Sequence, residues 1–445
     1  MGRRAVNSQR VLMVSPHFPP DNGAASHRVR LLAPHLPEFG WLPTVVTVDP
    51  RYYEGRLDPE LLSLVPSGLD VVRVPAWSVE RSRRFGFGDL GLRAFTSLRR
   101  ECRDLAKRRR FHCFFVTIYP TYPALLGPLM KRRARLPFVL DYQDPWVGEW
   151  GRSTGPGENG LPDARSRLSR AIASRLEPIA VAAADGITSV SDATYETVLE
   201  RIPRARPKVC ETIPLGGEAT DFAYLRSNPR PNPFFGPADG KFHLSYVGTL
   251  LPLGVPILRS VLRAVGRLKQ DHRPVYDRLR LHFIGTSNQS TGPLQDRVMP
   301  EAAASGVAEI VQEVSARAAY IDALNVLTQS NAILLMGSVE RHYTASKLYP
   351  ALSAGRPILA VFHEDSSVVS ILSRAMRHPT ARVVTYGGDG PGAFDEDRVH
   401  QHLLSMIGNP VYDAGGIDPR VIEEFSSRAM AERLARVLTR VSLPQ

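Results

Sequence analysis

The chain alternates short apolar runs with longer amphipathic segments along most of its length. Runs rich in Val, Ile, Leu and Phe predict buried strands, whereas segments with apolar residues three or four apart predict helices. In the first half, strands are predicted at 10–15, 44–48, 70–74, 113–118, 137–141, 186–190 and 208–213. In the second half, they are predicted at 242–247, 280–284, 309–311, 332–336, 357–362 and 381–385. Because helical segments separate the strands, we expect mostly parallel sheets covered by helices on both faces.

One segment interrupts this alternation. Residues 226–240 contain four prolines and two glycines, which cannot continue a helix or a central strand. We therefore expect a first domain at 1–228, a linker at 229–240 and a second domain at 241–417. Residues 418–445 are expected to form one long amphipathic helix that starts with an aspartate and a proline. The predicted fold class is α/β, with two tandem Rossmann-like, doubly wound domains.

Composition and charge indicate the cellular compartment and the possible partners of the protein. No apolar run is long enough to span a bilayer, and the N-terminus lacks the apolar region of a signal peptide. The three cysteines show no metal-ligand spacing and suit a reducing compartment, so a cytoplasmic protein is expected. The net charge of +12 is uneven, with 11 Lys/Arg against 3 Asp/Glu in residues 81–110.

The basic stretch 81–110 reads as an amphipathic helix preceded by Phe85-Gly86-Phe87-Gly88. Such a helix favours contact with an anionic membrane, which would place the protein at the inner face of the membrane. The alternative is a surface helix that packs its apolar stripe on the sheet. Nucleic acid is not an expected partner, because no helix-turn-helix, RNA-recognition or zinc pattern is present.

The segment 346–360 carries the strongest chemical signal. It follows the apolar run 332–336 and reads as a helix, a Gly-Arg-Pro turn and a strand. Ligands of parallel sheets bind beyond the carboxyl ends of the strands. Lys347 falls in the first turn of the helix, where unpaired N–H groups favour anions. We therefore expect an anionic ligand here, the alternative being a solvated lysine at a helix terminus.

The loop 16–28 joins the first strand to the first helix. Gly23 and its small neighbours would let a ligand approach the backbone closely. Arg28, one turn into the helix, could reach an anion. The alternative is a connector whose turn caps the helix. The loop is not a dinucleotide fingerprint, because Gly-x-Gly-x-x-Gly is absent.

A further candidate is the segment 138–146, where a buried strand ends at Asp141 and Asp144 with Trp146 beside them. Carboxylates at a strand's carboxyl end can bind hydroxyls or accept a proton, and a tryptophan offers a face for a sugar ring. The alternative is that Asp141 caps a turn and Trp146 is core. Asp395-Glu396-Asp397 matches a metal-binding Asp-x-Asp pattern, but an acidic first turn of a helix is preferred and no metal is assigned.

Four segments together resemble GT-B glycosyltransferases, in the family-4-like group that includes bacterial cell-surface polysaccharide transferases. Residues 11–28 resemble the opening strand, glycine loop and helix arginine of that group. Residues 137–146 resemble its Asp-x-Arg-Asp-x-Trp segment, and 213–222 with 244–248 resemble its entry to the donor domain. Residues 346–359 resemble its Ser-Lys donor segment. The resemblance covers nearly the whole chain.

The resemblance implies a nucleotide-sugar on the second domain, an acceptor on the first, and a final helix that crosses back to the first domain. It implies that Lys347 contacts the diphosphate and that its neighbours Ser346 and Leu348 also belong to the donor site. It implies further that Gly248 and Thr249 begin a loop facing the phosphates. Gly23 and Arg28 would contribute to the donor site. Asp144 would act on the acceptor side as the catalytic residue.

The expected function is transfer of a sugar from a nucleotide-diphosphate donor to a cell-surface polysaccharide, lipid-linked or secondary-metabolite acceptor. The resemblance implies a retaining hexosyltransferase without metal or cofactor, the nucleotide-sugar being the substrate. Departures from the family pattern leave alternatives open: Pro350 and His342 stand where the family places glutamates, and residues 249–254 lack the family's Arg and Lys. The alternatives are a catalytically inactive GT-B scaffold that binds a partner or glycan, and a nucleotide-sugar epimerase.

Overall fold

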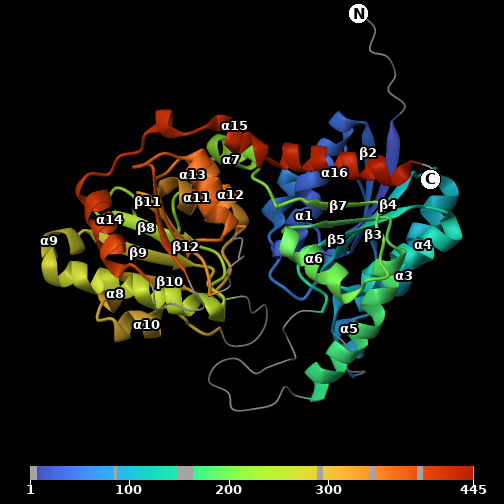
Figure 1. Ribbon diagram of the computed structural model, residues 1–445, viewed down its shortest axis with the longest axis horizontal. Coiled ribbons are helices and arrows are strands. Elements are labelled where there is room, and N and C mark those ends of the chain that lie inside the picture. The colour runs from blue at the N-terminus through green and yellow to red at the C-terminus, as the bar shows by residue number, and fades with distance from the viewer. Residues whose placement is uncertain are drawn as a thin grey trace, which may run out of the picture. The chain divides into compact units, whose positions relative to one another are not determined.

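The computed structural model describes residues 8–84, 88–147, 164–287, 294–339, 346–387 and 394–443. Its internal contacts divide the chain into two compact units. The first unit comprises Met1–Leu215 with Ser427–Gln445, and the second comprises Gly216–Ser426. Each unit is a parallel sheet with helices on both faces, so the predicted α/β fold class is confirmed (Figure 1).

The first unit is built on a seven-stranded sheet with the order β3-β2-β1-β4-β5-β6-β7. Its strands are β1 (Gln9–Val14), β2 (Trp41–Val48), β3 (Asp70–Val74), β4 (Cys113–Ile118), β5 (Phe138–Tyr142), β6 (Gly186–Ser189) and β7 (Val209–Thr212). All neighbouring pairs are parallel. The central strands β4 and β5 are buried along their whole length, as expected of strands covered on both faces.

The helices of the first unit connect these strands and cover the sheet. They are α1 (Ala24–Leu32), α2 (Val79–Arg84), α3 (Leu90–Arg108), α4 (Leu126–Ala134), α5 (Ala164–Ala183), α6 (Asp192–Arg201) and α16 (Ser427–Ser442). Short 3-10 helices are η1 (Ala33–Phe39), η2 (Pro50–Tyr52), η3 (Pro59–Leu64) and η4 (Tyr122–Leu125).

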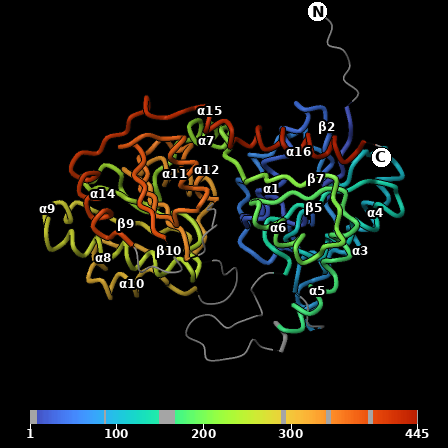
Figure 2. Tube along the Cα trace, viewed as in Figure 1, coloured from blue at the N-terminus to red at the C-terminus, as the bar shows by residue number. Residues whose placement is uncertain are grey.

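The second unit repeats the scheme with a six-stranded parallel sheet in the order β10-β9-β8-β11-β12-β13. Figure 2 shows the course of its chain from α7 to α15. Its strands are β8 (Phe242–Val247), β9 (Leu279–Ile284), β10 (Val311–Val314), β11 (Ala332–Met336), β12 (Ile358–His363) and β13 (Ala381–Tyr386). Its helices are α7 (Ala219–Ser227), α8 (Val255–Asp271), α9 (Arg273–Tyr276), α10 (Met299–Ala304), α11 (Tyr320–Gln329), α12 (Leu348–Ser353), α13 (Ser367–Ala375), α14 (Glu396–Gly408) and α15 (Pro419–Glu424). Short 3-10 helices are η5 (Pro252–Gly254), η6 (Ala308–Ile310) and η8 (Ala414–Gly416).

The C-terminal segment differs from the single helix predicted for 418–445. It contains two helices, α15 and α16, with Phe425 and Ser426 between them. The Ser426 side chain bonds to Glu423, and α15 belongs to the second unit while α16 belongs to the first. The sequence pattern continues across the break because both helices are amphipathic, so periodicity alone does not reveal it.

Helix α16 completes the core of the first unit. Its buried residues Met430, Leu434 and Leu438 join the cluster that contains Val11 and Met13 of β1. The indole of Trp41 also donates a hydrogen bond to the Thr439 hydroxyl over 3.2 Å. The expectation that the final helix returns to the first domain is therefore confirmed.

Helix α7 shows where the first unit ends. The sequence placed the end of the first domain at residue 228, whereas the division by contacts falls at Leu215. Helix α7 packs on α11, and the Tyr320 hydroxyl donates to the Asp221 carboxylate over 2.7 Å. The helix therefore belongs to the second unit although it precedes the proline-rich segment.

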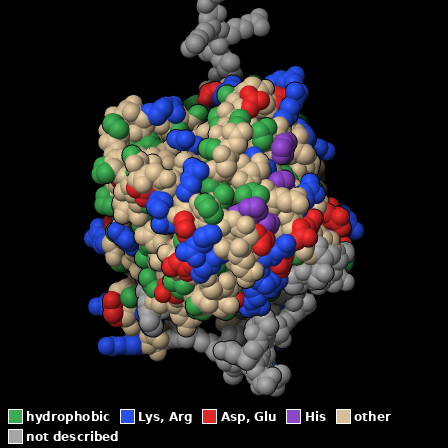
Figure 3. Space-filling model, turned by 90° about the vertical axis from the view of Figure 1, so that its left-hand side faces the viewer, with side chains coloured by type: hydrophobic (Ala, Val, Ile, Leu, Met, Phe, Trp, Pro, Cys, Tyr) green, Lys and Arg blue, Asp and Glu red, His purple; other side chains and the backbone are tan. Residues whose placement is uncertain are grey.

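The surface of the second unit has a mixed charge. On the face that carries α8, α9 and α14, Lys/Arg and Asp/Glu side chains are interspersed (Figure 3). Ion pairs between α8 and its neighbours account for this pattern: Arg259–Glu301, Arg263–Glu396 and Arg267–Asp397. Within the described ranges, no helix is both long and apolar enough to cross a membrane.

Candidate functional site

Each sheet reverses its strand order once, and each reversal marks a candidate site. In the first unit the reversal lies between β1 and β4, and in the second between β8 and β11. Loops leave the sheet in opposite directions at such a point, so a crevice opens beyond the carboxyl ends of the strands. The loops after β1, β4, β8 and β11 are therefore the places to look for binding chemistry.

In the second unit, Lys347 lies at this point. It is the N-cap residue of α12, at the end of the connection that leaves β11. Its amine donates to the carbonyl oxygen of Thr249 over 2.8 Å and stands 4.9 Å from the centroid of the Tyr246 ring. The Tyr246 hydroxyl donates to the same carbonyl over 2.9 Å. The cation is thus fixed against the loop that follows β8.

Gly248 permits this close packing. Its φ of +122° is rarely adopted by residues with a side chain. A Cβ added here would lie 2.5 Å from Cε of Lys347, which is closer than atoms can pack. The glycine therefore lets the lysine side chain cross directly over the backbone at the end of β8.

The environment of Lys347 disfavours its charged form. Burial, and secondarily the positive charge of Arg317, lower the pKa of the Lys347 amine to about 8. Across the described residues, no carboxylate lies within salt-bridge distance of this amine. A partly desolvated cation without a carboxylate gains more from an incoming anion than a solvated one does.

The other predicted donor-binding residues differ in exposure and in the contacts that they make. Ser346 is exposed immediately before Lys347, whereas Leu348 is fully buried, so only its backbone can face a ligand. Thr249 uses its carbonyl oxygen to hold Lys347. Gly23 is the N-cap of α1, and its N–H donates to the Asp21 carboxylate over 3.0 Å.

Arg28 differs from the expectation that it reaches a donor anion. Its side chain is fully buried and forms a two-point ion pair with Asp141, at 2.9 Å from Nε and 2.6 Å from Nη2. Nη1 donates to the carbonyl oxygens of Ile213 and Pro214. The arginine thus ties α1, β5 and the chain after β7 together within the first unit, and Asp141 serves as its counter-ion instead of capping a turn.

Trp146 and Asp144 lie in different environments, the tryptophan being buried and the aspartate exposed. Trp146 is buried and meets Tyr122 edge-on, so the alternative of a core tryptophan is correct and the sugar-stacking face is not available. Asp144 is exposed beyond the end of β5. The surrounding atoms nevertheless reduce its hydration, which raises the pKa of its carboxyl group.

Sequence reasoning missed a cluster at the reversal point of the first unit. The His17 imidazole Nδ1 lies 2.7 Å from the Asp21 carboxylate, and the ring is stacked with the rings of Tyr53 and Tyr119. The four-residue spacing from His17 to Asp21, and a tyrosine directly after β4, were the available signals. Neither is specific without the knowledge that these loops meet.

The basic stretch 81–110 contains a surface helix that packs its apolar stripe on the sheet, as the alternative interpretation predicted. The apolar residues Leu90, Leu98, Cys102 and Leu105 of α3 are buried in the core of the first unit. The outer face is cationic, with exposed side chains at Arg99, Arg100, Arg103, Lys107 and Arg108. Phe85-Gly86-Phe87 and His342 lie outside the described residues.

The acidic run 395–397 forms the start of a helix, as preferred from its sequence. Asp395 is the N-cap of α14 and accepts a hydrogen bond from the N–H of Arg398. Glu396 and Asp397 form ion pairs with Arg263 and Arg267 of α8. These contacts account for all three carboxylates without a metal.

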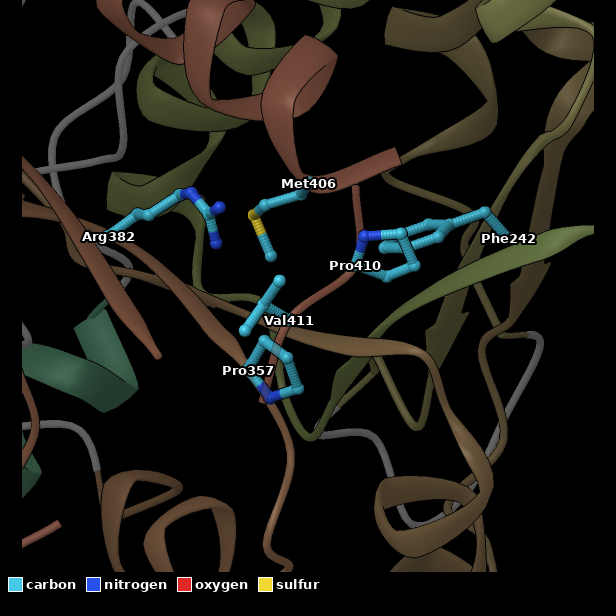
Figure 4. A pocket seen from close by; sticks show the side chains of 6 residues that line it. All are labelled: Phe242, Pro357, Arg382, Met406, Pro410 and Val411. Atoms are coloured by element: carbon cyan, nitrogen blue, oxygen red, sulfur yellow. The ribbon is translucent and has the colours of Figure 1, made fainter. Parts of the chain in front are cut away.

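A small recess lies at the opposite edge of the second sheet (Figure 4). It is lined by Phe242, Pro357, Arg382, Met406, Pro410 and Val411. Phe242 and Arg382 stand at the start of β8 and near the start of β13, so the recess lies at the amino ends of the strands. The fold rule for parallel sheets places ligands at the other edge.

Comparison with known proteins bears on the fold of the chain. A family model described as a glycosyl transferase 4-like domain matches residues 23–216, which is most of the first unit. No curated protein sequence matches the chain.

Solved structures cover nearly the whole chain at low identity. Anabaena Alr3699/HepE, in complex with UDP and glucose, is 13% identical, with 97% of this chain and 99% of that chain covered and a TM-score of 0.59. A glycosyltransferase from Rickettsia africae is 13% identical, with 98% and 99% covered and a TM-score of 0.57. A UDP-N-acetylglucosamine 2-epimerase from Listeria monocytogenes is 12% identical, with 96% and 95% covered and a TM-score of 0.50. At these identities the likeness establishes the fold, and the chain has a two-domain, GT-B-like architecture.

Proposed function

We propose that this protein is a glycosyltransferase that moves a sugar from a nucleotide-diphosphate donor to a hydroxyl-bearing acceptor. The observation that carries the proposal is Lys347, a partly desolvated cation held at the strand reversal of the second unit without a carboxylate partner among the described residues. A diphosphate supplies the negative charge that this position lacks. The match of 23–216 to a glycosyltransferase domain, and the UDP bound in the Anabaena structure, support the choice of ligand.

In this proposal the leaving diphosphate is stabilised by Lys347 and by backbone N–H groups around Gly248, so no metal or cofactor is required. Arg317 adds positive charge, since its field already acts on the Lys347 amine. This offsets the absence of Arg and Lys from residues 249–254. Electrostatic stabilisation of the leaving group is commonly the largest contribution to such catalysis.

The acceptor is proposed to bind on the first unit, near Asp144. Its class is a cell-surface polysaccharide, a lipid-linked glycan or a secondary metabolite. The transfer is proposed to retain the anomeric configuration of the sugar, as the family resemblance implies.

Contact with an anionic membrane is proposed through the cationic face of α3, from the cytoplasmic side. Because the apolar stripe of the helix is buried, the contact is electrostatic rather than inserted. We expect sedimentation with phosphatidylserine vesicles to fall in high salt and in Arg99→Glu/Arg103→Glu. Binding that ignores both changes would contradict this role of α3.

The test of donor binding is isothermal titration of UDP and other nucleoside diphosphates into the wild type and Lys347→Ala. We expect binding by the wild type and a loss of about 10- to 100-fold in affinity for the variant, as for one charge-assisted contact. Equal affinities of the two proteins for the nucleoside diphosphate would show that Lys347 does not contribute to the site.

The inactive-scaffold alternative is favoured by Pro350, which stands where the family places a glutamate. It is excluded if any nucleotide-sugar yields free nucleoside diphosphate with wild type but not with Lys347→Ala. The epimerase alternative is favoured by the Listeria neighbour. It predicts a changed sugar with no acceptor product, which chromatography of the released sugars distinguishes.

A further inference from the structure

Two histidines of the second unit form a buried, hydrogen-bonded pair. Nδ1 of His243 on β8 lies 2.9 Å from Nε2 of His282 on β9, and the two residues are 1% and 5% exposed. The outer nitrogen of each ring also has a partner. Nε2 of His243 lies 2.9 Å from the Asp239 carboxylate, and Nδ1 of His282 lies 2.8 Å from the side-chain oxygen of Gln312. A chain of four hydrogen-bonded side chains therefore crosses this sheet.

Residues 229–240, which we call the strap, cover the pair. The strap lies within the second unit, between α7 and β8. The ring of Phe235 is stacked on both imidazoles, with its centroid 4.3 Å from each of theirs. Asp239 supplies the carboxylate at one end of the chain, and the carbonyl oxygen of Arg230 accepts the side-chain amide of Asn325 over 3.2 Å. The docking of the strap thus depends on the state of the two histidines.

The geometry limits how many protons the pair can carry. An ionised Asp239 only accepts hydrogen bonds, so Nε2 of His243 carries a proton. The contact between the two rings holds exactly one proton. Gln312 can turn either its oxygen or its amide N–H toward Nδ1 of His282, so the docked pair is neutral or carries one positive charge. A second charge would set two N–H groups against each other across 2.9 Å.

The charges near the pair do not remove this limit. Charged side chains on the elements that pack against it are Arg230 and Asp239 of the strap, Lys241, Arg280 of β9 and Asp322 of α11. Arg230 and Asp322 pair with each other over 3.3 Å, and the Lys241 amine donates to the carbonyl oxygen of Asp277. Asp239 favours a positive charge on His282, whereas Arg280 opposes it.

Acid favours the released strap. Burial lowers the pKa of His282 to about 4, and the charge of His243 acts in the same direction after an opposing hydrogen bond to Gln312. A histidine in water titrates at about pH 6.5. Between these values the released state binds a proton that the docked state excludes. Docking is therefore complete above about pH 6.5 and weakens as the pH falls toward 4.

We propose that the strap is a pH-sensitive element, docked on the sheet at neutral pH and released when the histidine pair takes a second proton. Release uncovers Phe235 and both imidazoles on one face of the second sheet. This proposal is independent of the proposed function. The alternative is a purely structural pair that keeps the strap docked at every pH at which the protein is folded.

The first test is hydrogen exchange of the full-length protein at pH 7 and pH 5, read by mass spectrometry and corrected for the intrinsic exchange rates. The reporters are the N–H groups of Phe234, Phe235 and Lys241, which donate to side chains of the strap. We expect their protection to fall by about 20-fold at pH 5, the ratio that a pKa lowered from about 6.5 to about 4 gives. The protection of α8 should stay constant. Equal protection of the strap at both pH values overturns the proposal.

Two variants identify the titrating group. His282→Gln keeps a side-chain N–H for His243 but takes up no proton, so its strap should be protected equally at pH 7 and pH 5. His378→Gln removes an exposed histidine of the same unit and should respond as the wild type does. A His282→Gln variant that still loses protection in acid overturns the proposal.

The second test needs no variant. Nitrogen-15 NMR of histidine-labelled wild type, from pH 8 to pH 4, shows which ring nitrogens carry protons. We expect at most one imidazolium in the pair while the strap remains protected, and a second only as protection is lost. Two imidazolium rings beneath a protected strap would contradict the proposed proton limit and overturn the proposal.

Discussion

Arg28 and Lys347 both looked like anion-binding residues, each near the start of a helix that follows a strand, and the structure separates them. Arg28 is buried against Asp141, so its charge is already neutralised within the first unit. Lys347 meets a carbonyl oxygen and an aromatic ring, neither of which carries a full negative charge. The comparison teaches that a basic residue is a candidate for ligand binding when the described residues around it leave its charge uncompensated, whatever its place in a motif.

The largest expected effect is on stability, and it concerns Arg28. Arg28→Met leaves the Asp141 carboxylate buried without its counter-ion, which should lower the free energy of unfolding by about 3–5 kcal/mol. Urea denaturation followed by circular dichroism measures this. Arg28→Met/Asp141→Leu should recover most of the loss, because an apolar pair replaces both charges.

The control for this change is Arg428→Met, which removes the exposed pair with Glu38. Its ion pair spans 2.7 Å, but the two side chains are 51% and 43% exposed. Exposed pairs contribute less than about 1 kcal/mol. An Arg28 variant as stable as this control would mean that the buried pair is not structural, and the contrast with Lys347 would fail.

Lys347→Met should act in the opposite way. The free energy of unfolding should stay equal or rise, because the variant removes a cation that pays a desolvation penalty in the folded state. UDP affinity should still fall by about 10- to 100-fold. Thermal unfolding with and without UDP separates the two effects. A strongly destabilised variant would assign Lys347 a structural role like that of Arg28.

The pH dependence of UDP binding sharpens the contrast further. The pKa of Lys347 is about 8 in the free protein, and a bound diphosphate favours the protonated form. Affinity should therefore change little up to about pH 7, fall by about twofold at pH 8 and approach a fall of about tenfold per unit above it. Lys347→Arg stays charged throughout this range and should abolish the decline. A wild-type affinity that is flat to pH 10 would contradict a charged Lys347 at the phosphates.

The smallest effect is expected at Gly248. Gly248→Ala forces a methyl group against Lys347 Cε and strains a φ of +122°, so UDP affinity should fall by about fivefold, near 1 kcal/mol. Gly240→Ala is the matched control, since its φ is +79° and nothing lies within 4 Å of the added Cβ. Gly240→Ala therefore introduces the backbone strain of a positive φ without a clash against a side chain. Equal UDP affinities in the two variants would show that the position of Lys347 does not matter.

Much of the fold could be read from the sequence because buried parallel strands are continuous apolar runs. The strands predicted at 70–74, 113–118, 242–247 and 332–336 coincide with β3, β4, β8 and β11. The strand predicted at 309–311 did not, because Ala308–Ile310 is a 3-10 helix and β10 begins at Val311. An edge strand with the polar residues Gln312 and Glu313 lacks the apolar signal.

The candidate sites could be read only in part. Lys347 could be proposed as a site residue because its motif is local, lying within one loop and one helix. The partner of Arg28 was not, since Asp141 stands 113 residues away and both residues had been assigned to ligands. The pair His17–Asp21 is local, yet its neighbours Tyr53 and Tyr119 are brought to the same place only by the strand order.

The break between α15 and α16 has a consequence for biosynthesis. Residues 216–426 are all translated before α16, so the second unit can begin to fold while the core of the first is unfinished. Until then Val11, Met13 and Val29 lack the cover that Met430, Leu434 and Leu438 provide. The part of the protein made first thus completes its core last, and a nascent chain cut short before Ser427 exposes an apolar face that invites aggregation.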